Sequence, residues 1–351
     1  MKNFSIIFGL LLFVHSSLIA QSCQDLVNAI KNNDVASVKS LLKSVNPNCV
    51  YESDWEPNTP IGMAAKVGNV AIGKLLFAAK ARVSFRDHGD ATALMIAAEK
   101  GHEGFVKLLI SKGANVKRKI SGEGTPLIFA ARGGNYNIVK LFLTKGANPN
   151  RGVNGDGTPL IAAVKQGNPK IVKLLLDNGA NPSQAMDGDG SPLVMTRNVE
   201  VLKLLLAKGG DVNEEVEGDG TPLIRAANDR NFPLVQALVQ AGADVNKSSK
   251  GDGTPLISAA KEGDLQIVKY LIAKGAKVDA HLVGDENPLI RAAEHGHLAV
   301  VKYLVSKGAD VNKTVRSGYY LNSEKRSALK MAKRKGHSKI VEYLKSVGAK
   351  D

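Results

Sequence analysis

The sequence predicts an all-α solenoid of about ten helix–turn–helix units, and three observations carry that prediction. The heptapeptide GDGTPLI occurs three times, beginning at Gly155, Gly218 and Gly251. Positions equivalent to its Thr recur at steps of 33, 33, 33, 33, 30, 33, 33 and 40 residues. Aromatic residues make up only 5% of the chain, so small apolar side chains must fill the core. Such a period is typical of stacked units that bury their apolar faces only against one another.

Each unit carries start and stop signals for two short helices. In the unit that begins at Thr158, the hydroxyl is an N-cap and Pro159 takes the first helical position, where its missing N–H costs nothing. Gly167 can adopt the left-handed conformation that ends this first helix. A second helix is predicted from Pro169 to Asp177, and Gly179 stops it. The GDG triplet before each unit predicts a tight hairpin turn, because glycine supplies positive φ.

One unit is shorter than the others. The step of 30 residues after Ser191 removes three residues from the helix–turn–helix, including the alanine pair and the closing glycine. We therefore expect the first helix of this unit to lose nearly a turn and to pack more thinly. In a solenoid held by nearest-neighbour contacts, a weak unit divides the stack into two cooperative blocks.

These units resemble the ankyrin repeat from about Cys23 to Lys350. The resemblance is carried by segments such as TPLIFAARGGNYNIVKLFLTKGANPN from Thr125 and TPLISAAKEGDLQIVKYLIAKGAKVD from Thr254. It implies antiparallel helix pairs stacked in a curved solenoid, projecting β-hairpin loops, and a concave face that binds other proteins. Two features depart from the family pattern: Ile or Val follows TPL where His is usual, and two glycines bracket an acid. The second feature resembles the exported ankyrin arrays of bacteria.

The chain divides into four parts: a signal peptide (1–20), an N-terminal capping unit (21–49), eight central repeats (50–316) and a C-terminal capping unit (317–351). The first part has the charge, short apolar run and small final residue of a secretory signal peptide. The alternative, a membrane anchor, needs a longer apolar run. We therefore expect an exported monomer, periplasmic or extracellular.

The chain has two cysteines, Cys23 and Cys49. An exported protein reaches an oxidising compartment, so an even count suggests a disulfide, which would staple the first unit. Closing a loop of this length stabilises the fold by roughly 3 kcal/mol. The alternative is a lipidated Cys23 at the mature N-terminus, for which the preceding residues are a poor signal.

Two repeated charge patterns have ordinary structural explanations. One acid recurs in the hairpins, at Asp90, Glu123, Asp156, Asp189, Asp219, Asp252 and Asp285. At a repeat spacing of about 10 Å, one cation cannot bridge two of them, so we favour bonds to the turn's own backbone over ligand binding. Lysines recur on the second helices, at Lys107, Lys140, Lys173, Lys203, Lys269 and Lys302, and again before the following glycine, at Lys112, Lys145, Lys208, Lys274 and Lys307. Without interleaved aromatic residues, they indicate a solvated face rather than a nucleic-acid surface, despite a net charge of +14.

No catalytic, metal or cofactor motif stands out. The patterns HExxH, GxSxG and Walker A are missing from the sequence. His102, His297 and His337 fill a Gly-His position that the resemblance marks as structural. The sequence therefore predicts no enzyme and no cofactor, but a non-catalytic scaffold that binds a protein partner. The alternative is a dedicated inhibitor or immunity-type partner of an enzyme.

Candidate partner-binding residues lie two positions after the Leu of each first helix. This position is apolar in the first half of the chain, at Met63, Ile96 and Phe129, and basic in the second half, at Arg225 and Arg291. For the apolar residues we favour packing between neighbouring first helices over partner binding, and for the two arginines we favour partner binding. The 40-residue step adds Tyr319 and Tyr320, which either meet the partner or seal the C-terminal unit.

Overall fold

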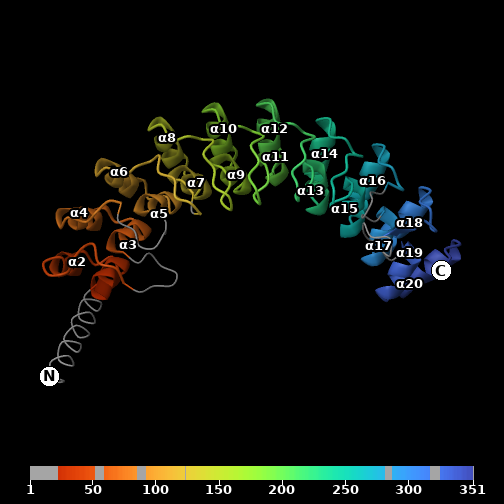
Figure 1. Ribbon diagram of the computed structural model, residues 1–351, viewed down its shortest axis with the longest axis horizontal. Coiled ribbons are helices and arrows are strands. Elements are labelled where there is room, and N and C mark those ends of the chain that lie inside the picture. The colour runs from red at the N-terminus through yellow and green to blue at the C-terminus, as the bar shows by residue number, and fades with distance from the viewer. Residues whose placement is uncertain are drawn as a thin grey trace, which may run out of the picture. The chain divides into compact units, whose positions relative to one another are not determined.

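The computed structural model describes residues 23–51, 59–84, 92–122, 124–280, 287–316 and 325–350 (Figure 1). The chain divides into two compact parts, Met1–Ala180 (unit 1) and Asn181–Asp351 (unit 2). Within each unit, helix pairs follow one another along the chain, and hairpin loops connect them. The predicted signal peptide lies outside the described residues, so its cleavage stays a prediction.

Unit 1 holds a capping helix pair and four full repeats. Its helices are a segment over residues 23–31, α2 (Val35–Leu41), α3 (Pro60–Val67), α4 (Val70–Ala78), α5 (Ala93–Glu99), α6 (Glu103–Ser111), α7 (Pro126–Arg132), α8 (Tyr136–Thr144), α9 (Pro159–Lys165) and α10 (Pro169–Asp177). The first helices α3, α5, α7 and α9 pack on one another in order, and the second helices α4, α6, α8 and α10 form a parallel row (Figure 1).

Unit 2 repeats this arrangement. Its helices are α11 (Pro192–Met195), α12 (Val199–Ala207), α13 (Pro222–Asn228), α14 (Phe232–Gln240), α15 (Pro255–Glu262), α16 (Leu265–Ala273), α17 (Pro288–Glu294), α18 (Leu298–Ser306), α19 (Ala328–Arg334) and α20 (Ser338–Ser346). First helices again contact first helices, and second helices contact second helices. The predicted all-α repeat solenoid is confirmed.

The predicted helix signals act as expected. The Thr158 hydroxyl accepts a hydrogen bond at 3.1 Å from the Ile161 backbone N–H, and Pro159 opens α9. Gly167 follows that helix with φ +68°. The second helix, α10, has the predicted bounds, and its N-cap is Asn168, whose side chain accepts from the N–H groups of the first turn. The hydroxyl or amide cap of the first helix recurs in each full repeat, whereas α5 and α19 begin without the proline.

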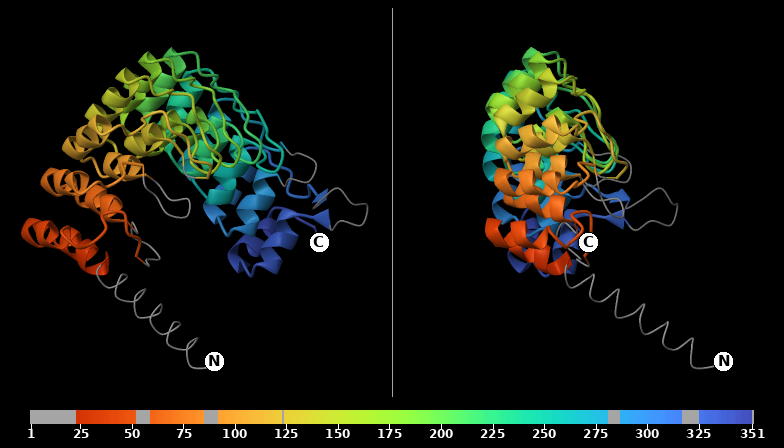
Figure 2. Two further views of the ribbon diagram at one scale, coloured as in Figure 1. Left: turned by 60° about the vertical axis from the view of Figure 1, so that its left-hand side comes forward. Right: turned by 90° about the vertical axis from the view of Figure 1, so that its left-hand side faces the viewer.

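The hairpins are minimal. Val153 and Gly157 form one isolated antiparallel bridge, and Gly155 between them takes the predicted positive φ, +91°. Four more hairpins have the same bridge: Ile120 with Gly124, Met186 with Gly190, Val216 with Gly220, and Ser249 with Gly253. In each unit the loops extend to one side of the helices (Figure 2). Only the last described hairpin forms a short ladder, β1 (Val315–Arg316) with β2 (Lys325–Arg326).

The short repeat is confirmed. α11 has 4 residues, whereas α9 and α13 each have 7. The loss is confined to the first helix, because the second helix of the same repeat, α12, keeps 9 residues. The three missing residues therefore shorten the row of first helices and leave the row of second helices intact.

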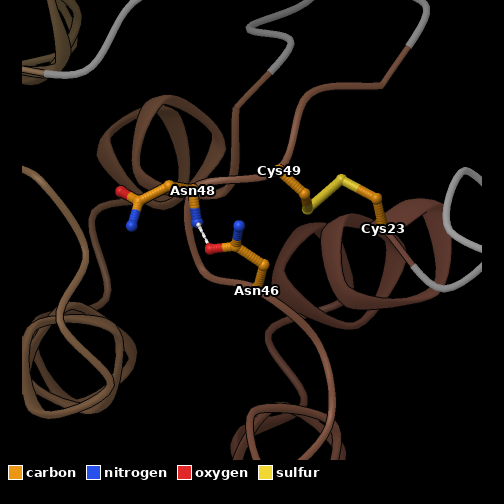
Figure 3. Close-up of a disulfide and its surroundings, with 4 residues drawn as sticks. All are labelled: Cys23, Asn46, Asn48 and Cys49. Atoms are coloured by element: carbon orange, nitrogen blue, oxygen red, sulfur yellow. Dashed lines mark hydrogen bonds between the residues drawn. A yellow bond between two sulfur atoms is a disulfide. The ribbon is translucent and has the colours of Figure 1, made fainter.

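The predicted disulfide joins Cys23 and Cys49 (Figure 3). Cys23 is fully buried at the start of the helix over residues 23–31, and Cys49 lies in the loop after α2. The Asn48 backbone N–H donates to Asn46 Oδ1 at 2.9 Å and so supports the loop before Cys49 (Figure 3). The bridge joins the start of the capping pair to the loop that follows its second helix.

Candidate functional site

We call the residue two positions after the Leu of each first helix the inner row. In unit 1 its members Met63 and Phe129 are buried, with exposed fractions of 1% and 6%. Ile96 is partly exposed. Met63 and Phe129 are thus core residues, as we favoured for the apolar row, and among the apolar candidates Ile96 keeps the most surface for a partner.

Phe129 is covered by its own hairpin and by the guanidinium group of Arg132. It clusters with the buried side chains of Met95 and Ile120, and the Arg132 guanidinium carbon lies 4.8 Å from the ring centroid. Arg132 also pairs with Asp156 of the next hairpin and lies within 3.7 Å of a Glu99 oxygen. Arg132 was not among the residues predicted from the sequence, although its position three residues after Phe129 on one helix could have indicated the contact.

In unit 2 the inner-row position of α13 is charged. Arg225 Nη1 lies 3.3 Å from Asp219 Oδ1 in its own hairpin, and its Nε lies 3.7 Å from Asp229 Oδ2. Asp229 Oδ2 also forms an ion pair with Arg197 Nε at 3.0 Å. The Arg225 side chain is 30% exposed, so this predicted residue lies at the surface but within an intramolecular ion-pair chain.

Arg291 in α17 has a similar arrangement. Its Nη1 lies 3.3 Å from Glu294 Oε2, and the other oxygen of Glu294 is 3.3 Å from Arg334 of the following repeat. The Arg291 side chain is 28% exposed, whereas Glu294 is 10% exposed. Glu294 therefore orients two guanidinium groups along the first helices of neighbouring repeats.

The hairpin acids differ from expectation. Asp156 and Asp219 pair with arginines on first helices and do not bond the backbone of their own turns, so that prediction is wrong for them. Burial raises the pKa of Asp252, and the negative charge of Asp219 raises it further. Asp90, Glu123 and Asp285 lie outside the described residues. Across the described ranges, no three His, Cys, Asp or Glu side chains are grouped so that they could hold a metal ion.

A comparison with protein families decides the assignment. A family profile described as ankyrin repeats (3 copies) matches residues 26–120, 118–186, 193–281, 228–315 and 281–351. The chain belongs to the ankyrin repeat family. Ankyrin repeats are generally protein–protein interaction scaffolds and are typically non-catalytic. A comparison with curated proteins finds no match.

The histidines of this ankyrin chain join neighbouring repeats, as the resemblance implied. His102, His297 and His337 each place Nε2 at hydrogen-bonding distance from a backbone carbonyl oxygen of the preceding repeat. The acceptors are Lys66, Lys261 and Glu294, at 3.0, 2.9 and 3.0 Å. Asn231 makes the equivalent bond from its Nδ2 to the Arg197 carbonyl at 2.8 Å. The Nε2 atoms of the three histidines therefore form hydrogen bonds that join neighbouring repeats.

The second helices near the C-terminus carry a feature that was not predicted from the sequence. Tyrosines follow the repeated lysine position there, and the structure places lysine amines against their rings. The lysine–tyrosine face comprises Lys269, Lys274, Lys302 and Lys307 with Tyr270, Tyr303 and Tyr343. The expected absence of aromatic residues among the lysines is thus wrong for α16, α18 and α20.

Two of the predicted site residues cannot be placed. Tyr319 and Tyr320 lie outside the described residues, between β1 and β2. The flanking pairs join Val315 to Arg326 and Arg316 to Lys325, so the additional residues of the last repeat belong to its hairpin.

None of the described helices is long and apolar enough to cross a lipid bilayer.

Proposed function

We propose that this ankyrin-repeat protein is an exported, non-catalytic scaffold that binds a protein partner through the inner row of unit 2. The observation that carries the proposal is that Arg225 and Arg291 are both partly exposed and held by ion pairs. Both side chains are about 30% exposed, and acids of the same chain hold their guanidinium groups in place. An arginine that is already oriented loses little side-chain freedom on binding, which is one reason that arginine often anchors interfaces.

The partner expected at this site has an acidic or mixed surface. Its carboxylates would share the guanidinium donors with Asp219 and Glu294, and each arginine has five N–H donors to divide among acceptors. In this proposal Tyr319 and Tyr320 add aromatic contact area from the last hairpin. If the partner is an enzyme whose activity falls on binding, the scaffold is a dedicated inhibitor.

Binding tests the proposal once the partner has been purified. Arg225→Ala and Arg291→Ala should each weaken binding by roughly 1–3 kcal/mol and leave the melting temperature nearly unchanged. Lys203→Ala, an exposed lysine on α12, is the control and should bind normally. If the control and the two arginine variants bind equally well, the inner row of unit 2 is not the site.

Export is tested separately on the protein made by its native host. N-terminal sequencing should find a chain that begins at Gln21 outside the cytoplasm. Mass measurement of the intact protein distinguishes a disulfide-bonded Cys23 from an acylated one. A chain that retains Met1 in the cytoplasm would contradict the export proposal and leave the binding proposal standing.

A further inference from the structure

The lysine–tyrosine face is held by contacts between repeats. Lys269 Nζ on α16 lies 5.6 Å from the ring centroid of Tyr303 on α18, and Lys307 Nζ lies 5.5 Å from the same centroid. Lys302 Nζ on α18 lies 5.4 Å from the ring of Tyr343 on α20. Amines at these distances are attracted to the negative face of an aromatic ring. Tyr303 and Tyr343 thus each hold a lysine of the preceding repeat in place.

A further aromatic contact extends the face toward α14. Lys274 Nζ lies 5.7 Å from the Tyr270 ring centroid. The Tyr270 ring meets the ring of Phe232 on α14 edge to face, with centroids 5.5 Å apart. The orientation of the amines is therefore set by tyrosine rings on three successive second helices, and Phe232 on α14 supports the first of these rings. Ordered amines lose less conformational entropy when they bind than free lysines do.

The charge of this face is not neutralised locally. Lys269, Lys274, Lys302 and Lys307 are exposed, and none forms an ion pair with a described carboxylate. Two equivalent lysines in unit 1 differ, because Lys107 pairs with Glu103 at 2.6 Å and Lys173 pairs with Asp177 at 2.5 Å. A third, Lys112, lies 5.9 Å from the ring centroid of Phe77. Like charges brought together repel one another, and an anionic partner would relieve that repulsion.

The final repeat adds to the same excess of charge. Residues 325–350 contain nine Lys or Arg and one Glu, which gives 9 − 1 = +8 of the net charge of +14 for the whole chain. On α20, Lys339 and Lys345 are exposed beside Tyr343, and Glu342 is the one acid of that helix. α20 therefore adds two exposed lysines and one acid to the second helices at the C-terminal end of unit 2.

The spacing of the amines indicates the form of the partner. Packed helices lie about 8–10 Å apart, so the lysine positions of α16 and α18 repeat at about that interval. An extended polypeptide rises about 3.3 Å per residue, so every third residue recurs at about 10 Å. A row of acidic side chains at that spacing can meet one repeat after another.

We propose that the lysine–tyrosine face binds an extended acidic segment of a partner protein, with a carboxylate at about every third residue. The face lies on second helices, and the inner row lies on first helices. The two surfaces are separate, so either can be correct without the other.

The test uses the full mature chain and a fluorescent peptide of repeated Glu-Ser-Gly triplets, with binding followed by anisotropy at low salt. The test variant replaces Lys269, Lys274, Lys302 and Lys307 with Gln. Its matched control replaces the same number of equivalent lysines in unit 1, Lys107, Lys112, Lys140 and Lys145, with Gln, so both variants carry the same net charge. A second peptide has the same composition with its glutamates in one block.

We expect the test variant to bind the triplet peptide about tenfold more weakly, since four exposed ion pairs are lost, and the control to bind within about twofold of the parent. The blocked peptide should bind the parent several-fold more weakly than the triplet peptide. Equal losses in the two variants would show attraction by net charge alone and overturn the proposal. So would tighter binding of polyphosphate, heparin or vesicles of anionic lipid through the same four lysines.

Discussion

Phe129 in unit 1 and Arg225 in unit 2 occupy the same position of the repeat, two residues after a buried Leu. The hairpin of each repeat supplies the matching partner: the apolar Ile120 packs against Phe129, and the carboxylate of Asp219 pairs with Arg225. Phe129 is therefore buried, while Arg225 stays 30% exposed. The comparison teaches that the hairpin and the first helix act as a pair: Phe129 is buried where the hairpin offers an apolar side chain, and Arg225 stays partly exposed where the hairpin offers a carboxylate.

The largest expected effect tests the core role of Phe129. Phe129→Ala removes a buried ring from the cluster with Met95 and Ile120, and should lower the free energy of unfolding of unit 1 by about 3–5 kcal/mol. Tyr136→Ala in the same repeat is the aromatic control, because this side chain is 41% exposed. Urea denaturation of both variants measures the difference. Similar losses for the two would mean that Phe129 is not a core residue.

The second effect tests whether the two units differ in covalent support. Both cysteines of the chain lie in unit 1, so Cys23→Ser combined with Cys49→Ser should destabilise that unit by about 3 kcal/mol. Amide exchange should accelerate most in residues 23–51 and hardly change in α15 and α16. A uniform acceleration over the chain would contradict the independence of the units, because solenoid contacts join nearest neighbours.

The third effect contrasts the short repeat of unit 2 with a full repeat of unit 1. α11 has 4 residues and α9 has 7, so fewer backbone amides of the short helix are protected by packing on both sides. Hydrogen exchange should be roughly tenfold faster over residues 191–200 than over residues 158–167, after correction for intrinsic rates. Equal protection in the two segments would contradict the idea that the short repeat is weak.

Most of the fold could be predicted from the sequence, because the signals that set it act locally. Thr158, Pro159 and Gly167 act on their own turns, and so the helix bounds and the short repeat could be predicted. Burial of the inner row could not be predicted in the same way. It depends on which hairpin residue covers each side chain, as Ile120 covers Phe129, and that contact follows from the turn of the hairpin in space.

The ion pairs and ring contacts were harder still to predict. Arg132 meets Asp156 across a repeat boundary, and Lys269 meets Tyr303 in the same way. Pairs of this kind are separated by most of a repeat or more, and only the stacking of helices brings them together. A period in the sequence predicts that stacking, but the direction of each long side chain also depends on its neighbours.

The fourth prediction expects a smaller loss of stability and concerns Arg225 in unit 2. Arg225→Leu should change the free energy of unfolding by less than about 1 kcal/mol, because the ion pairs of Arg225 are partly exposed and Asp229 keeps Arg197 as a partner. Urea denaturation with Lys203→Leu as the control measures this effect. A loss as large as that of Phe129→Ala would show that Arg225 supports the core as Phe129 does.

The smallest effect concerns Glu214, a hairpin residue that reaches the start of α11. The Ser191 hydroxyl donates a hydrogen bond to Glu214 Oε1. Burial nevertheless raises the pKa of Glu214 above its ordinary value of 4.5, and the hydrogen bond from Ser191 opposes only part of that shift. In two other hairpins this position is basic: Lys247 Nζ donates to the Asn213 carbonyl at 2.6 Å, and Arg151 donates to the Lys117 carbonyl at 3.3 Å. The Ser191 hydroxyl that caps the short helix thus donates to a carboxyl group whose pKa is raised by burial.

The sign of the resulting pH dependence follows from proton binding. Between pH 4.5 and the higher pKa of the folded state, folded Glu214 holds a proton that the unfolded chain has released. The free energy of opening this repeat should therefore rise as the pH falls from neutral into that interval. Amide exchange at Val194 and Met195, corrected for the intrinsic effect of pH, should slow accordingly in the parent protein. In Glu214→Gln this slowing should disappear, because the amide does not titrate but can still accept from Ser191. If the Gln variant keeps the same pH dependence, another group controls the opening of the short repeat.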